Sequence, residues 1–537
     1  MSDGSMPWLT PAREELLARV FTVGLAAIAG AWALSSLWLP YGWDHGMFGY
    51  VGDTIVRGGL PYRDALDFKG PLTYYVVAAL DLVLGRQMWG LRALDLALLA
   101  AASFAGVRVA SQFISRRAAW CTMLALVIAF ASFGNWYTAQ PDDWAACGIV
   151  VVVSLLVAPG QASARNAALA GAILGACCLL KPLYLVYLAL VACALWPSRA
   201  DGRDGVRRAL VASAAGAAGF ALPIVLAVVW FAAHGALGAM IDVYLRYNME
   251  RSSEASGTLP LSKVIQVAIG LPTSLPVLAV VLPAATLGGA FVVRERPRAG
   301  LILVLWAVVS VGAIAMQRKF FLHNYSWHPL FQAIGFLAGI GLARAWNGRG
   351  IDVLPGRWLF VVTAFAALKL AAHEPLVDVA RWAKLVTGRS TLAQYRGAYD
   401  VNVFYGPASN FSFSVPRDVA IARYLDEHTR PTDEILVWSD PLVNTLADRR
   451  AIGSITVAQA FTVWGSEARR TGYREALVAH MNEPDAAYFA VSERDLTPSS
   501  DEQSMPTLAP EVLEALHAEY EPDVRIGDMQ LFKRRGR

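Results

Sequence analysis

Ionisable residues interrupt the apolar runs of this chain at a few places, and their types suit acid–base and phosphate chemistry. The polar stretch that begins at residue 41, YGWDHGMFGYVGDTIVRGGLPYRDALDFKG, contains Asp44 and Lys69. The PDDW turn contains Asp142 and Asp143, and Lys181 stands alone between two apolar runs. A carboxylate can take the proton of an attacking hydroxyl. A lysine can hold a phosphate and stabilise it as a leaving group.

A further basic set lies in the segment QRKFFLHNYSWH, which contains Arg318, Lys319, His323 and His328. Charged groups at a membrane boundary are expensive, so they are candidates for function. Together these residues predict a reaction between a lipid-linked phosphate and a hydroxyl at the membrane surface.

Each candidate also has a purely structural interpretation. Asp44 can belong to an ordinary loop, and Lys69 and Lys181 can extend their ammonium groups toward the interface. One carboxylate of Asp142 and Asp143 can cap a helix expected to start at Trp144, because an acidic group there favours the helix dipole. A lone histidine is more often a hydrogen-bonding residue than a catalyst.

The composition predicts a membrane protein with many spans. Of the 537 residues, 56% are hydrophobic and only 16% are charged, whereas soluble domains carry about 25% charged residues. The net charge of +4 is small, and no basic cluster with interleaved aromatics indicates a nucleic-acid partner. The five cysteines lie in apolar runs, where they are expected to be small buried side chains rather than disulfides or metal ligands.

About eleven apolar runs are candidates for crossing a bilayer, although several are short for that purpose. The chain is therefore expected to be an α-helical polytopic membrane protein. The expected spans are residues 20–40, 89–107, 118–133, 144–157, 167–180, 182–196, 209–233, 264–293, 301–316, 330–342 and 358–372. Residues 72–84 are too short for a crossing and contain Asp81, so an interfacial helix is expected there. Residues 237–248 have similar amphipathic spacing.

The arginines of the connecting loops support this arrangement. With the N-terminus in the cytoplasm, all the arginine-rich loops fall on the cytoplasmic side, as the positive-inside rule requires. This result needs a break at Lys181-Pro182 that divides residues 167–196 into two short spans. The arginines concerned are Arg13, Arg19, Arg116, Arg117, Arg165, Arg199, Arg203, Arg207, Arg208, Arg294, Arg296, Arg298, Arg344, Arg349 and Arg357.

The polar tail predicts a separate soluble domain. Helical patterns at 416–428, 466–480 and 509–518 alternate with strand-like runs at 434–438, at 486–491 and in MQLFKR near the end. This alternation is typical of a small α/β domain. We therefore expect a transmembrane domain over residues 1–374 and an extracytoplasmic α/β domain over residues 375–537.

The segment WDHGMFGYVGDTIVRGGLPYRDALDFKGPLTYYVVAALDLVLG, followed by MWGLRALDL, resembles the first external loop of GT-C glycosyltransferases. These multi-span enzymes use polyprenyl-phosphate-linked sugars. The protein O-mannosyltransferase-like and aminoarabinose-transferase-like bacterial proteins share the pattern of an acidic residue, G-x-P-Y-x-D, K-G-P and an interfacial helix. The QPDDW turn, LLKPLYL and KFFLHNYSWHP fall where that family has its acidic, lysine and H-Y…P features, and the tail resembles its extracytoplasmic domain.

The resemblance implies a role for each matching position. Asp44 takes the place of the first-loop carboxylate, a presumed base or acceptor-orienting group, and Asp142 or Asp143 takes the place of a second acidic residue. The expected lipid-phosphate-binding residues are Lys69, Lys181, Arg318, Lys319, His323 and Tyr325. Two departures stand out: Asp44-His45 replaces the Asp-Glu of many relatives, which gives no support for a metal ion, and Asn324 separates His323 from Tyr325.

The resemblance therefore implies an enzyme that moves a single sugar from a polyprenyl-phosphate donor to a lipid, polysaccharide or protein acceptor at the outer face of a bacterial inner membrane. Membrane lipids are the other expected partners, and no cofactor is expected. A lipid-linked oligosaccharide ligase or polymerase is an alternative, as is an inactive structural subunit. A transporter is favoured less, because transporters often have two repeated halves and charges near the bilayer midplane. The proposed chemistry predicts that Asp44, Lys69 and Lys181 converge beneath the extracytoplasmic domain.

Overall fold

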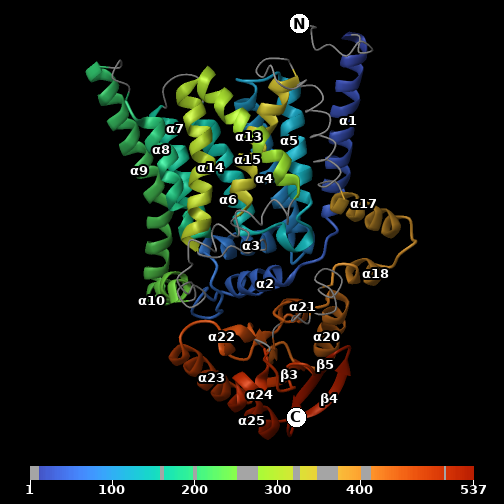
Figure 1. Cartoon of the computed structure of the whole chain (residues 1–537). Helices are drawn as coiled ribbons and strands as arrows, with labels where there is room; N and C mark the ends of the chain where they lie inside the picture. Colours follow the sequence, from blue (N-terminus) through green and yellow to red (C-terminus); the bar gives the residue numbers. More distant parts are fainter. Residues whose placement is uncertain are drawn as a thin grey trace. The chain divides into compact units, whose positions relative to one another are not determined.

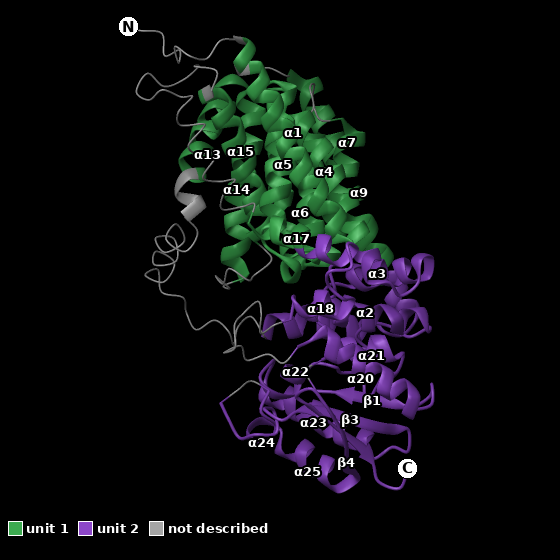
Figure 2. Ribbon diagram, turned by 90° about the vertical axis from the view of Figure 1, so that its right-hand side faces the viewer, with its two compact units in different colours: residues 1–37, 92–228, 256–380 green, residues 38–91, 229–255, 381–537 purple. Residues whose placement is uncertain are grey.

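The computed structural model describes residues 11–157, 163–197, 202–250, 276–317, 327–346, 373–400, 413–438, 440–500 and 503–537. The chain divides into two compact units, coloured separately in Figure 2. Unit 1 comprises residues 1–37, 92–228 and 256–380, and unit 2 comprises residues 38–91, 229–255 and 381–537. The first polar stretch thus belongs to the same unit as most of the tail.

Unit 1 is built from helices (Figure 1). Because most of these helices are apolar around much of their circumference, they suit a lipid environment. The helices are α1 (Pro11–Ser36), α4 (Met88–Ala110), α5 (Arg116–Ala131), η1 (Asn135–Tyr137), α6 (Pro141–Val157), α7 (Ala164–Leu180), η2 (Pro182–Tyr187), α8 (Leu188–Leu195), α9 (Gly202–Ala233), α13 (Pro276–Glu295), α14 (Pro297–Gln317) and α15 (His328–Trp346). The first residues of α4 and the last of α9 are counted in unit 2.

Among the described residues, four helices are long and apolar enough to cross a membrane: most of α1, and all of α4, α9 and α14. This places the chain in a membrane, as the composition predicts. The expected break at Lys181 is also present, because α7 ends at Leu180 and η2 begins at Pro182. Lys181 has the extended backbone that a following proline favours. The expected span at 358–372 lies outside the described residues, and the number of crossings stays a prediction.

Unit 2 combines three separate parts of the chain. The first polar stretch forms α2 (Trp43–Val56) and α3 (Pro71–Leu84), and the segment at 237–248 forms α10 (Leu237–Met240) and the π-helix η4 (Ile241–Tyr247). The helices expected at 72–84 and 237–248 are therefore present. The tail contributes the end of α17 (His373–Val386) and then α18 (Leu392–Gly397), α20 (Val415–His428), α21 (Leu442–Ala447), α22 (Ala458–Thr462), α23 (Glu467–Met481), α24 (Met505–Leu508) and α25 (Pro510–Glu519).

A five-stranded sheet in the tail confirms the predicted α/β character. Its strands are β1 (Glu434–Val437), β2 (Arg450–Ala451), β3 (Ala486–Ser492), β4 (Tyr520–Ile526) and β5 (Met529–Arg534), in the order β2-β1-β3-β5-β4. β1 is parallel to β2 and β3, whereas β5 is antiparallel to β3 and β4. The core of this region buries side chains of α20, α21 and the sheet, including Ile421, Val443 and Leu531.

Candidate active site

In unit 2 the structure brings together the two charged residues expected from the first polar stretch. Asp44 lies in the first turn of α2, and Lys69 lies two residues before α3. Lys69 Nζ is 3.5 Å from Asp44 Oδ2, and the two side chains are 16% and 13% exposed. Such a long, partly accessible pair keeps both groups near the surface of the unit, where a ligand can compete for the ammonium group.

The backbone at Lys69 is held by side chains from two other segments. The Tyr62 hydroxyl donates to the Lys69 carbonyl oxygen at 2.7 Å, and Tyr74 Oη lies 3.3 Å from the same oxygen. The Asn248 amide, at the end of η4, donates to the carbonyl oxygen of Phe68 at 2.7 Å. These contacts fix the backbone from which the Lys69 side chain extends.

Asp67 completes this support. Its carboxylate accepts hydrogen bonds from the Phe68 amide at 2.7 Å and from the Tyr74 hydroxyl at 2.8 Å. Burial raises the pKa of Asp67 to about 6, even though nearby Lys69 lowers it, and the charge of Asp44 adds to the increase. Asp67 is thus a buried carboxyl group that titrates close to neutral pH.

Tyr62 has a backbone conformation that is uncommon for a tyrosine, with a φ of 71°. Its ring packs against Tyr74, Phe231 and Tyr244, at centroid distances of 5.9, 5.9 and 6.4 Å. This packing over-determines the turn, which is how a strained residue persists at a functional site.

His45 directly follows Asp44 in the first turn of α2. Its Nδ1 accepts a hydrogen bond from the Gly42 amide at 2.8 Å, and its side chain is buried. His45 therefore caps the N-terminus of α2 and so supports the helical turn that carries Asp44. Among the described residues, no group of three or more histidine, cysteine, aspartate or glutamate side chains is arranged to hold a metal ion.

In unit 1 the structure brings together a second acid–lysine pair. Lys181 Nζ donates to Asp142 Oδ1 at 3.0 Å, and the Tyr184 hydroxyl donates to the same carboxylate oxygen. Asp142 is almost fully buried, while the Lys181 side chain is 28% exposed. Lys181 lies at the break between α7 and η2, and Tyr184 lies three residues later in η2. Both side chains reach Asp142 in the first turn of α6.

Asp142 and Asp143 have different partners, which the sequence could not distinguish. The helix expected from Trp144 begins earlier, at Pro141, so both carboxylates lie in its first turn. Asp143 Oδ2 accepts a hydrogen bond from the Gln140 amide at 3.0 Å, and Oδ1 lies 2.7 Å from His328 Nδ1. Asp143 therefore caps α6 and contacts α15, whereas Asp142 binds the lysine.

The remaining expected phosphate-binding residues, Arg318, Lys319, His323 and Tyr325, lie outside the described residues. Asp44 and Lys69 belong to unit 2, and Lys181 belongs to unit 1. Their convergence stays a prediction.

This chain resembles known proteins in its structure but not detectably in its sequence. No protein-family model matches the sequence, and no curated protein does. The crystal structure of ArnT from Cupriavidus metallidurans in the apo state matches with a TM-score of 0.58 and 14% identity over 96% of this chain and 98% of that chain. The structure of the same ArnT bound to undecaprenyl phosphate also has a TM-score of 0.58, with 15% identity over 95% of this chain and 97% of that chain.

The chain has the fold of ArnT. ArnT is an aminoarabinose transferase of the GT-C type, so the fold class expected from the first-loop resemblance is confirmed. Archaeal oligosaccharyltransferase AglB from Archaeoglobus fulgidus, in complex with an inhibitory peptide and a dolichol-phosphate, matches more weakly, with a TM-score of 0.46 and 12% identity over 95% of this chain and 74% of that chain. The fold comparison with ArnT covers nearly the whole of both chains.

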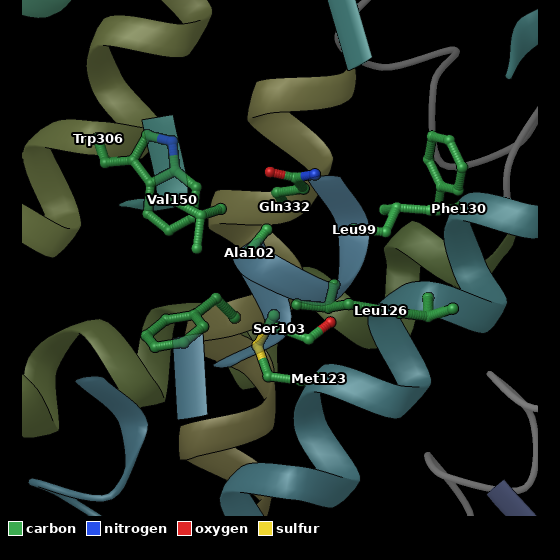
Figure 3. Close-up of a pocket in the computed structure, with 11 residues that line it drawn as sticks. Leu99, Ala102, Ser103, Met123, Leu126, Phe130, Val150, Trp306 and Gln332 are labelled. Atoms are coloured by element: carbon green, nitrogen blue, oxygen red, sulfur yellow. The ribbon is translucent and has the colours of Figure 1, made fainter. Parts of the chain in front are cut away.

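The ArnT-like helices of unit 1 also enclose a small cavity, shown in Figure 3. Its lining is mostly apolar and comes from α4, α5, α6, α14 and α15, with Ser103 and Gln332 as the polar side chains. A volume of about 20 Å³ has room for roughly one water molecule. A sugar or a lipid phosphate does not fit in this volume, so this cavity is not a candidate substrate site.

Sequence reasoning missed several residues that support the charged pairs. Asp67, Tyr62 and Tyr74 hold the segment that carries Lys69, and Tyr184 shares Asp142 with Lys181. Tyr184 follows Lys181 by three residues, and this spacing could have indicated that the two side chains contact the same carboxylate. The other three look like ordinary loop and interfacial-helix residues until their hydrogen bonds are seen.

Proposed function

We propose that the chain is a GT-C glycosyltransferase that moves a single sugar from a polyprenyl-phosphate donor to a lipid, polysaccharide or protein acceptor. The observation that carries the proposal is the Asp44–Lys69 pair within a fold shared with ArnT, which has been solved with undecaprenyl phosphate bound. The pair supplies a carboxylate for the acceptor and a cation for the lipid phosphate within one small region of unit 2.

The proposed reaction uses these two groups on opposite partners. The Asp44 carboxylate takes the proton of the acceptor hydroxyl while the hydroxyl oxygen forms a bond to the anomeric carbon of the sugar. The bond between that carbon and the phosphate oxygen breaks, and its electron pair leaves with the polyprenyl phosphate. Lys69 stabilises the charge of the departing phosphate. No cofactor enters this sequence of steps.

Lys181 is proposed as a second phosphate-binding residue, with Asp142 and Tyr184 fixing its ammonium group. Arg318, Lys319, His323 and Tyr325 are proposed to add to the same phosphate-binding function. Asp143 is proposed to act through the position of α6, because it caps that helix and contacts His328 of α15.

The proposed location is a bacterial inner membrane. The N-terminus would lie in the cytoplasm, and residues 375–537 would form an extracytoplasmic domain. The distribution of arginines among the loops supports this orientation. Reaction at the outer face is consistent with a donor whose tail remains in lipid.

A transfer assay tests the proposal. Purified protein is incubated with a panel of undecaprenyl-phosphate monosaccharides and an acceptor fraction from bacterial envelopes, and released undecaprenyl phosphate and the glycosylated product are measured by mass spectrometry. Loss of a general base or a phosphate contact lowers rates by about 100-fold or more. We expect losses of this size in Asp44→Asn and Lys69→Met.

Glu521→Gln is the control, because Glu521 is an exposed side chain on β4. It should retain the wild-type rate. Wild-type activity in Asp44→Asn would refute the role of the carboxylate. Activity with long diphosphate-linked glycans, and none with monosaccharide phosphates, would instead identify an oligosaccharide ligase or polymerase.

A further inference from the structure

An aromatic side chain from the tail meets the segments that carry both members of the Asp44–Lys69 pair. Trp464 lies between α22 and α23. Its ring centroid is 5.1 Å from that of Phe68, which precedes Lys69, and 6.5 Å from that of Trp43, which precedes Asp44. A residue some 400 positions away in sequence thus contacts the immediate neighbours of the two charged residues.

Trp464 is less enclosed than the tryptophan in the core of the same domain. Phe68 and Trp43 meet Trp464 at interplanar angles of 88° and 78°, so neither ring stacks on it. Trp438, by comparison, is fully buried and stacks on Phe461 and Phe489 at angles of 14° and 29°. Trp464 is only half-buried. Part of Trp464 is therefore accessible at the surface of the unit.

The backbone around Trp464 is fixed on both sides. The Trp464 amide donates to the Gln459 carbonyl oxygen at 2.8 Å, and the Arg470 guanidinium donates to the carbonyl oxygens of Val463 and Gly465. Gly465 has a φ of +82°, and a Cβ atom there would lie 2.8 Å from the Tyr247 ring. The turn can approach η4 this closely only with glycine.

Arg469 joins the same turn to η4 and the residues that follow it. Its guanidinium makes hydrogen bonds of 2.6 and 3.1 Å to the Asp242 carboxylate, and of 3.0 Å to each carboxylate oxygen of Glu250. These bonds lower the pKa values of Asp242 and Glu250, which therefore remain ionised near neutral pH. Trp464 is consequently held in a preorganised position rather than on a loose loop.

We propose that Trp464, together with Phe68, forms the wall that receives the sugar of the polyprenyl-phosphate donor. This inference rests on the proposed function. Lys69 Nζ is 5.7 Å from the Phe68 ring centroid. A phosphate at Lys69 therefore places the attached sugar, one oxygen atom away, beside these rings. The C–H face of a pyranose is apolar and packs on an aromatic surface, whereas the hydroxyls at its edge remain free for hydrogen bonds.

The proposal assigns Trp464 to the sugar and Lys69 to the phosphate, so the two contributions can be separated by binding measurements. The probes are undecaprenyl phosphate and a panel of undecaprenyl-phosphate monosaccharides, titrated against the purified full chain. Trp464→Leu removes the ring but keeps an apolar side chain, and Trp464→Phe keeps a smaller ring. Loss of an aromatic contact of this kind reduces affinity by about tenfold.

We expect Trp464→Leu to lose about tenfold in affinity for the preferred sugar-bearing lipid and to bind undecaprenyl phosphate as the wild type does. Trp464→Phe should retain part of the sugar affinity. Trp89→Leu is the matched control, since Trp89 is an exposed tryptophan of the same unit, and it should change neither affinity. Thermal unfolding in detergent verifies that each variant is folded.

Other outcomes separate this inference from the function on which it rests. A Trp464→Leu variant that binds and transfers sugar like the wild type overturns the sugar wall and leaves the transferase proposal intact. Equal weakening for both kinds of lipid also overturns it, because Trp464 then acts through the position of Lys69. A wild-type protein that binds neither undecaprenyl phosphate nor any sugar-bearing lipid overturns the proposed function itself.

Discussion

At the scale of single residues, the two lysines of the candidate site that lie among the described residues are each paired with a carboxylate. Asp44 accompanies Lys69, and Asp142 accompanies Lys181. A partly buried charge needs such a partner, because desolvation without one is costly. The two pairs differ in burial: Asp142 is almost fully enclosed and is shared with Tyr184, whereas Asp44 is more exposed. The more accessible carboxylate is the better candidate for contact with an acceptor.

Asp67 gives a prediction about pH. Its pKa rises from 3.8 to about 6 because the carboxyl group is buried. The ionised form therefore opposes folding, so this contribution to stability is complete below pH 3.8 and is lost as the pH rises through 6. A shift of this size corresponds to about 3 kcal/mol. We expect wild-type stability in detergent to fall more steeply between pH 4 and 7 than that of Asp67→Asn, measured by thermal unfolding.

Asp64→Asn is the control for this experiment. Hydrogen bonding to Arg63 lowers the pKa of Asp64, so removing that carboxylate should reduce stability at neutral pH rather than flatten the profile. Parallel pH profiles for the wild type and Asp67→Asn would show that Asp67 does not titrate in this range.

Residue types and order along the chain predicted which charged groups matter but not all of their neighbours. Asp44, Lys69 and Lys181 stood out because charge is rare near apolar runs. Trp464 did not, because its importance comes from contacts with Phe68 and Trp43, far away in sequence. Asp67 was one of several acidic residues in its stretch until its burial was known.

At the scale of elements, α2 is the helix that must be placed correctly. It packs against α3 and α21, and its glycines permit both contacts. A Cβ atom on Gly46 would lie 2.9 Å from the backbone of Leu442 in α21, and one on Gly52 would lie 2.8 Å from the Val77 side chain in α3. Gly46 lies two residues after Asp44, so the position of α21 directly affects the turn that carries the carboxylate.

Gly46→Ala should therefore destabilise the protein and reduce transfer. The obstructing atoms are backbone atoms of Leu442, which cannot rotate away, and overpacking of this kind costs about 1–3 kcal/mol. Gly472→Ala is the matched control, because Gly472 lies inside α23 with nothing within 4 Å of an added Cβ. In that helix alanine should raise stability by about 0.5–1 kcal/mol. Changes in unfolding temperature, relative to the wild type, that have the same size and sign in the two variants would contradict the close approach of α2 and α21.

The sequence predicted the helices and strands of the tail where the periodic pattern of apolar residues was strong. The expected helix at 416–428 and the strands at 434–438 and 486–491 correspond to α20, β1 and β3. β2 was missed because it has only two residues, and β4 because it is mostly exposed and so lacks an alternating apolar pattern. The earlier start of α6 was missed because Pro141 looked like part of a turn, although proline is favoured in the first turn of a helix.

At the scale of the molecule, hydropathy and residue contacts divide the chain into domains at different places. Hydropathy predicts a division near residue 374, and that division stays a prediction. Contacts place residues 38–91 in the same compact unit as the tail. The Leu66 amide donates to the Ser454 carbonyl oxygen at 2.7 Å, and the Ala451 amide donates to the Tyr50 hydroxyl at 3.0 Å. Such contacts join segments separated by about 390 to 400 residues, and composition contains no information about them.

The arginine distribution leads to a prediction of orientation for the whole molecule. Arg116 and Arg117 follow the expected second span, and the positive-inside rule assigns them to the cytoplasm. The C-terminus is then extracytoplasmic. Alkaline phosphatase fused after Arg537 should be active in a bacterial host, and green fluorescent protein fused there should be dark. Fusions after Gln112, just before these arginines, should show the reverse. A fluorescent C-terminal fusion with inactive phosphatase would place the tail in the cytoplasm, and sugar transfer at the outer face would then lose the domain that carries Trp464.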